Sequence, residues 1–323
     1  MLKDLLENRQ CFKLVCGAGN EDAQEVEKLV TIYSLAGCNF FDVSAKSEIV
    51  DAAKRGILNS GIKENRYLCV SVGIDGDPHI TKANIDLDKC ISCGACSTIC
   101  PHDAIFYKNG FKVKKERCLG CGKCDAICSQ KAISIESQLI DYKEVLPELI
   151  AKGIDCIEFH AISNNEADVD EKWMQINELY DGFLCISLDR SELGDKKLKD
   201  RVERMIANRL QFSTIIQADG IAMSGNDDEL GTTLQAVSTA QLFQNAKMPA
   251  YIMMSGGTNT KSTELAKKCG VFPHCIAIGS YARKILKKYL KMDDILENKK
   301  ALEEAVLIAK SLIDVSLENM KID

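Results

Sequence analysis

Short apolar runs and longer segments of mixed character alternate along most of the chain. Eight of the apolar runs are continuous rather than alternating, which is typical of strands covered on both faces of a parallel sheet. Glycine or polar residues follow most of them, as expected for short strands joined by turns. The predicted strands cover residues 12–16, 39–43, 67–72, 155–159, 183–188, 213–216, 250–254 and 274–278.

The segments between these runs repeat apolar residues at helical spacing. The first places Val26, Leu29, Val30 and Tyr33 mostly on one face and stops at Gly37. Further helices are predicted at 47–58, 142–151, 168–179, 195–210, 233–246 and 262–269, and two helical segments form the tail to residue 323. Strand–helix units in such a series predict a TIM-like (β/α)8 barrel.

A doubly wound α/β sheet is the alternative fold class. Its support is the segment Gly17-Ala-Gly19 after the first strand, with Asp42 after the second, which together resemble a dinucleotide-binding fingerprint. That fingerprint requires a small residue where this chain has Asp22. Because only part of the motif is present, we favour the barrel.

A cysteine-rich stretch interrupts the alternation after the third predicted strand. It contains two runs of four cysteines with the same spacing of x2, x2 and x3. This spacing is typical of ferredoxins that bind two [4Fe–4S] clusters, in which the fourth cysteine of each run ligates the other cluster. We therefore assign cluster I to Cys90, Cys93, Cys96 and Cys128, and cluster II to Cys118, Cys121, Cys124 and Cys100.

A pair of structural zinc sites is the alternative, since CxxC pairs also bind zinc. Zinc sites of that kind use two pairs of ligands and need neither the third nor the fourth cysteine of each run. The spacing thus favours a ferredoxin-like insertion. The predicted parts are a first section of the barrel at 1–79, the two-cluster insertion at 80–136, the remainder of the barrel at 137–290 and C-terminal helices at 291–323.

Composition narrows the class of protein. A net charge of −6 disfavours a nucleic-acid partner, and no apolar run approaches the ~20 residues of a membrane span. The N-terminal segment lacks the apolar core of a signal peptide, so we expect a cytoplasmic protein. Sixteen cysteines in a reducing compartment indicate metal ligation rather than disulfides. We expect most of the cysteines outside the two runs to be small buried hydrophobes.

The loops after the last two predicted strands could bind a phosphate group. In TIM barrels this site is often built from these loops and a short helix N-terminus, where backbone N–H groups face the anion. The candidate residues are Ser255, Gly256, Gly257, Thr258, Gly279, Ser280 and Tyr281. FMN is the candidate cofactor. Arg283 could add positive charge or could be an ordinary solvated residue, and tight turns without a ligand are the alternative for both loops.

Several polar residues lie in or just after predicted strands, where barrel enzymes hold their active sites. The candidate catalytic residues are Lys13, His160, Gln217 and Asp219. Asp42, Ser71, Glu158, Asp189 and Arg190 are further candidates for the same pocket. Each could instead be a buried pair partner, a helix cap or a turn residue.

Six segments together with the cluster runs resemble the LdpA (light dependent period A) family. They are FKLVCGAGNED, YSLAGCNFFDVSA, VSVGIDGDPHI, QADGIAMSG, MSGGTN and IAIGSYARK, and they extend from about residue 12 to 284. The resemblance implies an iron–sulfur redox protein with a ferredoxin-like module and a C-terminal domain of the family's own. In cyanobacteria the family is linked to light-dependent circadian period. Both cluster runs are complete here, closer to a bacterial two-cluster ferredoxin, so the circadian role is not carried over.

Three functions follow from these features. An oxidoreductase would pass electrons through the clusters to a flavin or a phosphate-bearing substrate in the barrel. A redox sensor or adaptor, as the resemblance suggests, would signal cluster state to a partner protein. An electron-carrier subunit would use the barrel to dock in a larger complex. Each requires a redox partner protein, and whether the chain is an enzyme stays open because a fold alone does not specify a function.

Overall fold

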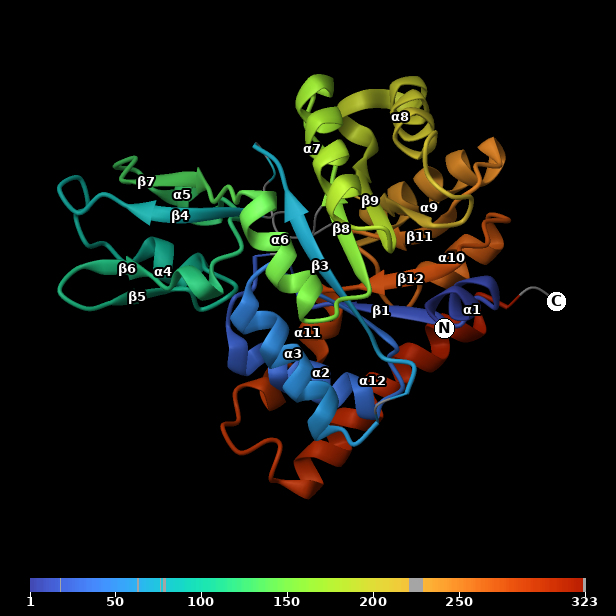
Figure 1. Ribbon diagram of the computed structural model, residues 1–323. Helices are drawn as coiled ribbons and strands as arrows, with labels where there is room; N and C mark the ends of the chain where they lie inside the picture. Colours follow the sequence, from blue (N-terminus) through green and yellow to red (C-terminus); the bar gives the residue numbers. More distant parts are fainter. Residues whose placement is uncertain (18, 63, 76, 78–79, 221–228, 322–323) are drawn as a thin grey trace.

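Eight parallel strands form a closed barrel surrounded by helices (Figure 1). The structure is a computed structural model that describes residues 1–323 except 18, 63, 76, 78–79, 221–228 and 322–323. The barrel strands are β1 (Cys11–Val15), β2 (Phe40–Ser44), β3 (Tyr67–Gly73), β8 (Cys156–His160), β9 (Phe183–Asp189), β10 (Thr214–Asp219), β11 (Tyr251–Ser255) and β12 (Cys275–Ile278). The β1 strand pairs with β2 and β12, which closes the ring. The predicted TIM-like barrel is confirmed, and the doubly wound alternative is wrong.

The helices lie outside the ring of strands. They are α2 (Ala23–Leu35), α3 (Ser47–Asn59), α6 (Tyr142–Ala151), α7 (Glu166–Leu179), α8 (Arg190–Ile206), α9 (Glu229–Ala246), α10 (Ser262–Lys268), α11 (Ser280–Leu290) and α12 (Lys299–Glu318). The helix predicted at 195–210 begins and ends earlier, and Gly194 within it has non-helical backbone angles. Asp22, which breaks the dinucleotide fingerprint, caps α2 by accepting a hydrogen bond from the backbone N–H of Glu25 at 3.1 Å.

Two layers of apolar side chains stabilise the barrel. The larger layer lies between the sheet and the helices and consists mainly of Ile, Leu and Val. The smaller one fills the N-terminal end of the barrel interior, where helix α1 (Leu2–Glu7) inserts Leu2 and Leu6. Five cysteines contribute to this inner layer: Cys11, Cys69, Cys156, Cys185 and Cys275. Of the eight cysteines outside the two runs, all but Cys269 are buried, as expected.

The cysteine-rich stretch forms a separate lobe that leaves the barrel after β3 (Figure 1). Its outer strands β4 (Thr81–Ile85) and β7 (Ile133–Ser137) pair in antiparallel fashion, and β5 (Ile105–Tyr107) and β6 (Phe111–Val113) form a hairpin. Two one-turn helices, α4 (Ala95–Ile99) and α5 (Lys123–Ile127), carry cysteines of the two runs, and a 3-10 turn, η2 (Lys115–Arg117), precedes the second run. The lobe has a small core of its own, centred on Ala83, Ile105 and Ile133. The insertion after strand three is thus confirmed.

Each cluster run turns at a glycine that no other residue type would replace easily. Gly94 and Gly122 precede α4 and α5 and have φ values of 81° and 73°. Glycine adopts this left-handed conformation without the steric penalty of a Cβ atom.

Among the described residues, no helix combines the length and the apolar character needed to cross a membrane.

Candidate functional site

The eight cysteines of the two runs line two cavities in the lobe. One cavity, with about 380 Å³ of empty space, is lined by Cys90, Cys93, Cys96 and Cys128 among other residues. The other, with about 340 Å³, is lined by Cys100, Cys118, Cys121 and Cys124. Each cavity therefore combines three cysteines of one run with the last cysteine of the other. The structure thus groups the cysteines as they were assigned from the spacing, and four thiolates around one cavity would fit a [4Fe–4S] cluster.

Backbone N–H groups are directed at three of these sulfur atoms. Ala104 donates to Sγ of Cys100 and Ala132 donates to Sγ of Cys128, both at 3.3 Å, so the two runs repeat the same local geometry. Ala83 donates to Sγ of Cys118 at the same distance. Hydrogen bonds to cluster sulfurs stabilise the more negative, reduced state and so raise the reduction potential.

The second cavity adjoins the C-terminal end of the barrel. The buried ammonium of Lys82 donates to the carbonyl oxygens of Gly19 in the β1–α2 loop at 2.6 Å and of Cys118 at 2.9 Å. The backbone N–H of Glu21 donates to the carbonyl of Glu116 at 2.8 Å. The segments that line the second cavity thus lie against the loop that follows β1.

Ion pairs also hold the lobe against the barrel. Arg117 lies 3.2 Å from a carboxylate oxygen of Glu25 on α2, and Lys291 lies 3.0 Å from Asp103. The segment GAGNED, which resembles a dinucleotide fingerprint, therefore contacts the lobe through Gly19, Glu21 and Asp22. In this structure the segment GAGNED therefore holds the cysteine-rich lobe against the barrel.

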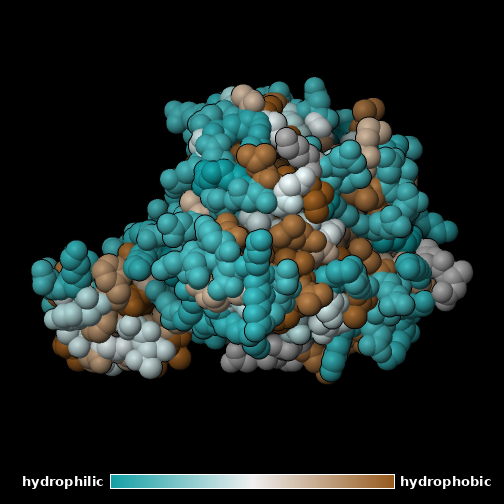
Figure 2. All heavy atoms as spheres, turned by 90° about the horizontal axis from the view of Figure 1, so that it is seen from below, coloured by the Kyte–Doolittle hydropathy of each residue, from teal (hydrophilic) through white to brown (hydrophobic). Residues whose placement is uncertain are grey.

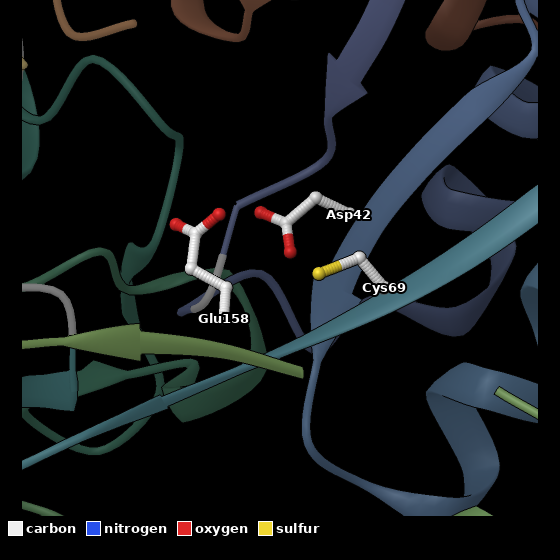
Figure 3. A group of neighbouring side chains, drawn as sticks. All are labelled: Asp42, Cys69 and Glu158. Carbon is white, nitrogen blue, oxygen red and sulfur yellow. The ribbon is translucent and has the colours of Figure 1, made fainter. Parts of the chain in front are cut away.

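Inside the barrel, a buried lysine lies between two carboxylates. The ammonium of Lys13 forms an ion pair with Glu158 and lies 3.9 Å from Oδ1 of Asp42. Figure 3 shows the side chains of Asp42, Cys69 and Glu158 directed toward one another from β2, β3 and β8. Their ligand atoms lie within 4.8 Å of one another, which resembles a metal site. The Lys13 ammonium already lies between the two carboxylates, so this group of side chains gives no reason to place a metal there.

His160 extends this network toward the lobe. Its Nδ1 lies 2.6 Å from Oδ2 of Asp77, and its Nε2 lies 3.1 Å from Oε1 of Glu158. Burial acts to lower the pKa of His160, but the two carboxylates outweigh it and hold that pKa well above its usual value. The imidazole therefore carries a proton at neutral pH.

Gln217 and Asp219 complete the network on β10. The amide of Gln217 donates to Oε1 of Glu158 at 2.9 Å and reaches both oxygens of Asp219 at 3.3 Å. The hydroxyl of Ser187 donates to Asp219 at 2.5 Å. The structure thus brings together all four predicted catalytic candidates. Lys13, His160 and Gln217 contact Glu158, and Asp219 joins them through Gln217.

The direction of the pKa shift divides the carboxyl groups of the network into two kinds. Burial raises the pKa of Asp42 to about 6 against the attraction of Lys13. It also raises the pKa of Asp219 to about 6, helped by the repulsion of Glu158. Burial acts on Glu158 in the same direction, but Lys13 and His160 outweigh it and lower the pKa of that carboxyl. Glu158 is therefore ionised, while Asp42 and Asp219 titrate nearer to neutrality.

Sequence reasoning missed Asp77 and Ser187, both of which are buried in this network. Asp77 lies in the segment that follows β3. Its position just beyond the end of a barrel strand could have marked it as a candidate for the barrel-mouth pocket. Among the described side chains, the candidate Arg190 at the end of β9 pairs outside the network. Arg190 forms an ion pair with Asp195 on its own helix, and the side chain of Asp189 lies outside those that the structure describes.

The first of the two predicted phosphate loops, at residues 255–258, is tightly packed. Gly257 has a φ of 73°, and a Cβ atom there would lie 2.3 Å from Oγ1 of Thr232. The carbonyl of Gly257 accepts a hydrogen bond from Thr233, and the hydroxyl of Thr258 donates to the carbonyl of Ala277. Ser255 and Thr258 are buried, and Gly256 adopts a φ of 62°. The geometry of the turn is therefore sufficient to explain why glycines occupy positions 256 and 257.

The loop after β12 is more open. Gly279 precedes α11, and Ser280 is exposed in the first turn of this helix, followed by half-buried Tyr281. Arg283 is not a solvated residue, since its guanidinium donates to the carbonyls of Val15 and Cys16 at 2.8 and 2.9 Å. It therefore fixes the end of β1 against α11.

Comparisons with known proteins bear on both parts of the chain. Residues 83–106 match a family model described as a 4Fe-4S binding domain, and residues 95–139 match one described as the LdpA Fe-S cluster-binding domain. Residues 148–315 match the light dependent period A C-terminal domain. The cluster-binding matches coincide with the cysteine-rich lobe.

Two synthases are among the solved structures that resemble this chain. A truncated 3-deoxy-D-arabino-heptulosonate 7-phosphate synthase from Thermotoga maritima has a TM-score of 0.46 at 12% identity, covering 97% of this chain and 89% of that one. A tryptophan synthase from M. tuberculosis has a TM-score of 0.48 at 8% identity, covering 100% of this chain and 97% of that one.

A curated relative covers almost the whole chain. It is "Light dependent period A" of Synechococcus elongatus, which is 30% identical over 315 residues, corresponding to 93% of this chain and 87% of the relative. The family models place iron–sulfur binding in the cysteine-rich lobe and the family's C-terminal domain in the rest of the chain. The chain is an iron–sulfur cluster-binding protein and belongs to the light dependent period A family.

Proposed function

We propose that the protein passes single electrons through two [4Fe–4S] clusters to a phosphate-bearing cofactor or substrate, with FMN as the candidate, at the C-terminal mouth of the barrel. The observation that carries the proposal is the double hydrogen bond of Lys82, which joins Cys118 of the second cavity to Gly19 of the barrel. A cluster held there would lie beside the strand ends where barrel enzymes react.

The two cavities suggest a direction for electron flow. Cys93 of the first cavity is exposed, whereas Cys118 and Cys124 of the second cavity are buried. A cluster in the first cavity is thus accessible to a partner protein, and a cluster in the second lies on the barrel side. Electrons would enter or leave at cluster I and reach the barrel through cluster II.

The network inside the barrel supports proton transfer beside this path. Asp219, with a pKa of about 6, can hold or release a proton near neutral pH, while Glu158 stays ionised and orients His160 and Gln217. The ammonium of Lys13 offsets part of the free-energy cost of burying the carboxylates of Asp42 and Glu158. FMN would supply the coupling between one-electron and two-electron chemistry when bound.

The start of α11 offers support for a phosphate group. The first turn of a helix leaves backbone N–H groups without intrahelical acceptors, and the helix dipole favours an anion there. Ser280 is exposed at this position, so a phosphate could approach without displacing packed side chains. The more tightly packed loop at 255–258 would position this turn rather than contact the phosphate.

The test starts from protein purified without oxygen. We expect iron and acid-labile sulfide equivalent to about eight atoms each per chain, the content of two [4Fe–4S] clusters, and FMN released on denaturation and identified by mass spectrometry. Ser280→Glu should abolish FMN retention because it places a carboxylate at the phosphate position, while the neutral Ser280→Gln, of the same size as the glutamate, should retain it. FMN bound equally by both variants would contradict the site, and iron at half the expected amount would contradict two clusters.

A redox sensor or adaptor is the second candidate function, and one observation favours it. The charged side chains of the network balance one another inside the barrel, so no ligand is needed to stabilise them. Two clusters without an organic cofactor in the purified protein would favour this function, or that of an electron-carrier subunit. A stable partner that co-purifies in fixed proportion would then distinguish the subunit from the sensor.

A further inference from the structure

Large apolar side chains are exposed on the outer part of the cysteine-rich lobe. Leu87 is 50% exposed, Ile91 63% and Tyr107 64%, although these residue types are usually covered in a small domain. Figure 2 shows brown, apolar atoms on the projecting lobe among hydrophilic ones. We define the outer patch as Leu87, Ile91, Tyr107 and half-buried Phe111.

The members of the outer patch gather around the hairpin of β5 and β6, and two of them line the first cavity. The rings of Tyr107 and Phe111 are 5.2 Å apart in an edge-on arrangement, and Leu87 packs over Gly110 at the tip of the same hairpin. Ile91 and Phe111 both line the cavity that contains Cys90 and Cys93. Whatever covers this patch therefore lies next to cluster I.

The hairpin that carries half of the patch is basic. Residues 104–115 contain four lysines and no acidic residue, whereas the whole chain has a net charge of −6. Lys108, Lys112 and Lys114 are exposed, and the register of the hairpin places Lys112 opposite Phe106, on the face away from Tyr107. On the other side of the patch, Asp86 is balanced by Lys89 at 3.0 Å. Lys108 therefore adds positive charge next to Tyr107, while Lys112 and Lys114, which lies over the ring of Phe106, add it on the opposite face of the same hairpin.

We infer that the outer patch is the docking site of a small acidic protein that carries one electron, an inference that rests on the proposed electron transfer. An apolar centre with a charged border is typical of transient interfaces, in which charge steers association and apolar contact brings the cofactors together. In the exchange, a reduced [4Fe–4S]⁺ cluster gives one electron and returns to [4Fe–4S]²⁺. The oxidised flavin of a carrier takes that electron and one proton from solvent and becomes the neutral semiquinone.

Stopped-flow mixing of the reduced protein with an oxidised flavodoxin, an acidic FMN carrier, tests the inference. The bimolecular rate of semiquinone formation should fall as salt is added. Lys108→Glu with Lys112→Glu should lower it about tenfold at low salt. The matched control is Lys196→Glu with Lys197→Glu, the same charge change at exposed positions of α8, which should leave the rate within about twofold because these lysines lie on the barrel.

Tyr107→Ser separates apolar contact from charge. It should slow the reaction while keeping its dependence on salt, because it removes ring area and no charge. Equal rates for the lysine double variant and its control would overturn the inference, as would faster oxidation by a basic cytochrome c than by flavodoxin at low salt. All variants should keep the iron content and the dithionite reduction of the parent protein. If the parent protein itself lacks iron or is not reduced by dithionite, this result counts against the proposed electron transfer and not against the docking site.

Discussion

The imidazole of His160, at the end of β8, lies 2.6 Å from the carboxylate of Asp77, beyond the end of β3. Both side chains are buried, and a Cβ atom on the neighbouring Gly73 would lie 2.0 Å from the same carboxylate. Asp77 belongs to the segment that leads out of the barrel into the lobe. The contact therefore connects the acid–base network of the barrel to the start of the cysteine-rich insertion.

Asp77→Asn should destabilise the protein by about 3 kcal/mol near pH 6, because it removes the main partner of a buried imidazolium. The pKa of His160 is raised in the folded state, so its contribution to stability is complete below its unfolded pKa of about 6.5 and is lost as pH rises through the folded pKa. The loss in the variant should therefore shrink toward alkaline pH.

Urea unfolding followed by the fluorescence of Trp173, the chain's one tryptophan, measures this loss in the barrel. Asp200→Asn, at an exposed position of α8, is the control and should change the free energy of unfolding by less than about 0.5 kcal/mol. A loss of equal size at every pH would mean that Asp77 does not act through the charge of His160.

Lys13→Met should destabilise the barrel by about 4 kcal/mol, since it leaves Asp42 and Glu158 buried without their cation. Lys310→Met offers a contrast, because Lys310 pairs with Asp314 on the surface of α12 and should contribute less than about 1 kcal/mol. The same fluorescence measurement compares the two. Similar losses for both variants would show that the buried ammonium is not required for the network.

Asp42 and Asp219 should make the folded protein less stable as pH rises from about 4 to 6. Burial raises the pKa of each to about 6, above the unfolded value of about 3.9, so the folded state binds more protons in that window. Glu158, with its lowered pKa, acts in the opposite direction only at more acidic pH.

Asp219→Asn should remove its part of this decline, on the order of 2 kcal/mol. The free energy of unfolding between about pH 4 and pH 6, measured anaerobically for the variant and the parent, gives the slope. The amide oxygen of the introduced asparagine can still accept the hydrogen bond of Ser187, so the substitution tests the charge rather than the contact. An unchanged slope would mean that Asp219 stays ionised throughout this range.

Crossed ligation of the clusters predicts an unusual pattern among cysteine variants. Cys128→Ala should resemble Cys93→Ala, since both sulfurs line the first cavity, and should differ from Cys124→Ala, which affects the second. Each variant should keep about half of the iron, because one ligand set stays complete. EPR spectra of the remaining cluster provide the comparison, and the exposed Cys269→Ala is the control. A match between Cys128→Ala and Cys124→Ala would exclude the crossed arrangement.

The barrel and the grouping of the cysteines around two cavities could be predicted because their signals are local. Continuous apolar runs predict buried strands, and thiolate spacing predicts the crossed cavities, without knowledge of distant contacts. The partners of buried charges could not be predicted in this way. Asp77 and His160 meet although they are 83 positions apart in the sequence, and Arg283 bonds carbonyls at the other end of the chain. Such pairings depend on which strands become neighbours, so only the folded chain reveals them.

The pairing of β4 with β7 brings the two ends of the inserted segment together. Thr81 lies opposite Ser137 in this ladder, and the backbone N–H of Gln138 donates to the carbonyl of Ile80 at 2.8 Å. Because the chain leaves the barrel and returns to it at nearly the same place, the order of the barrel strands does not depend on what lies between. The lobe is thus a cassette, and a single insertion of a ferredoxin gene segment would convert a plain barrel into an iron–sulfur protein without redesign of either part.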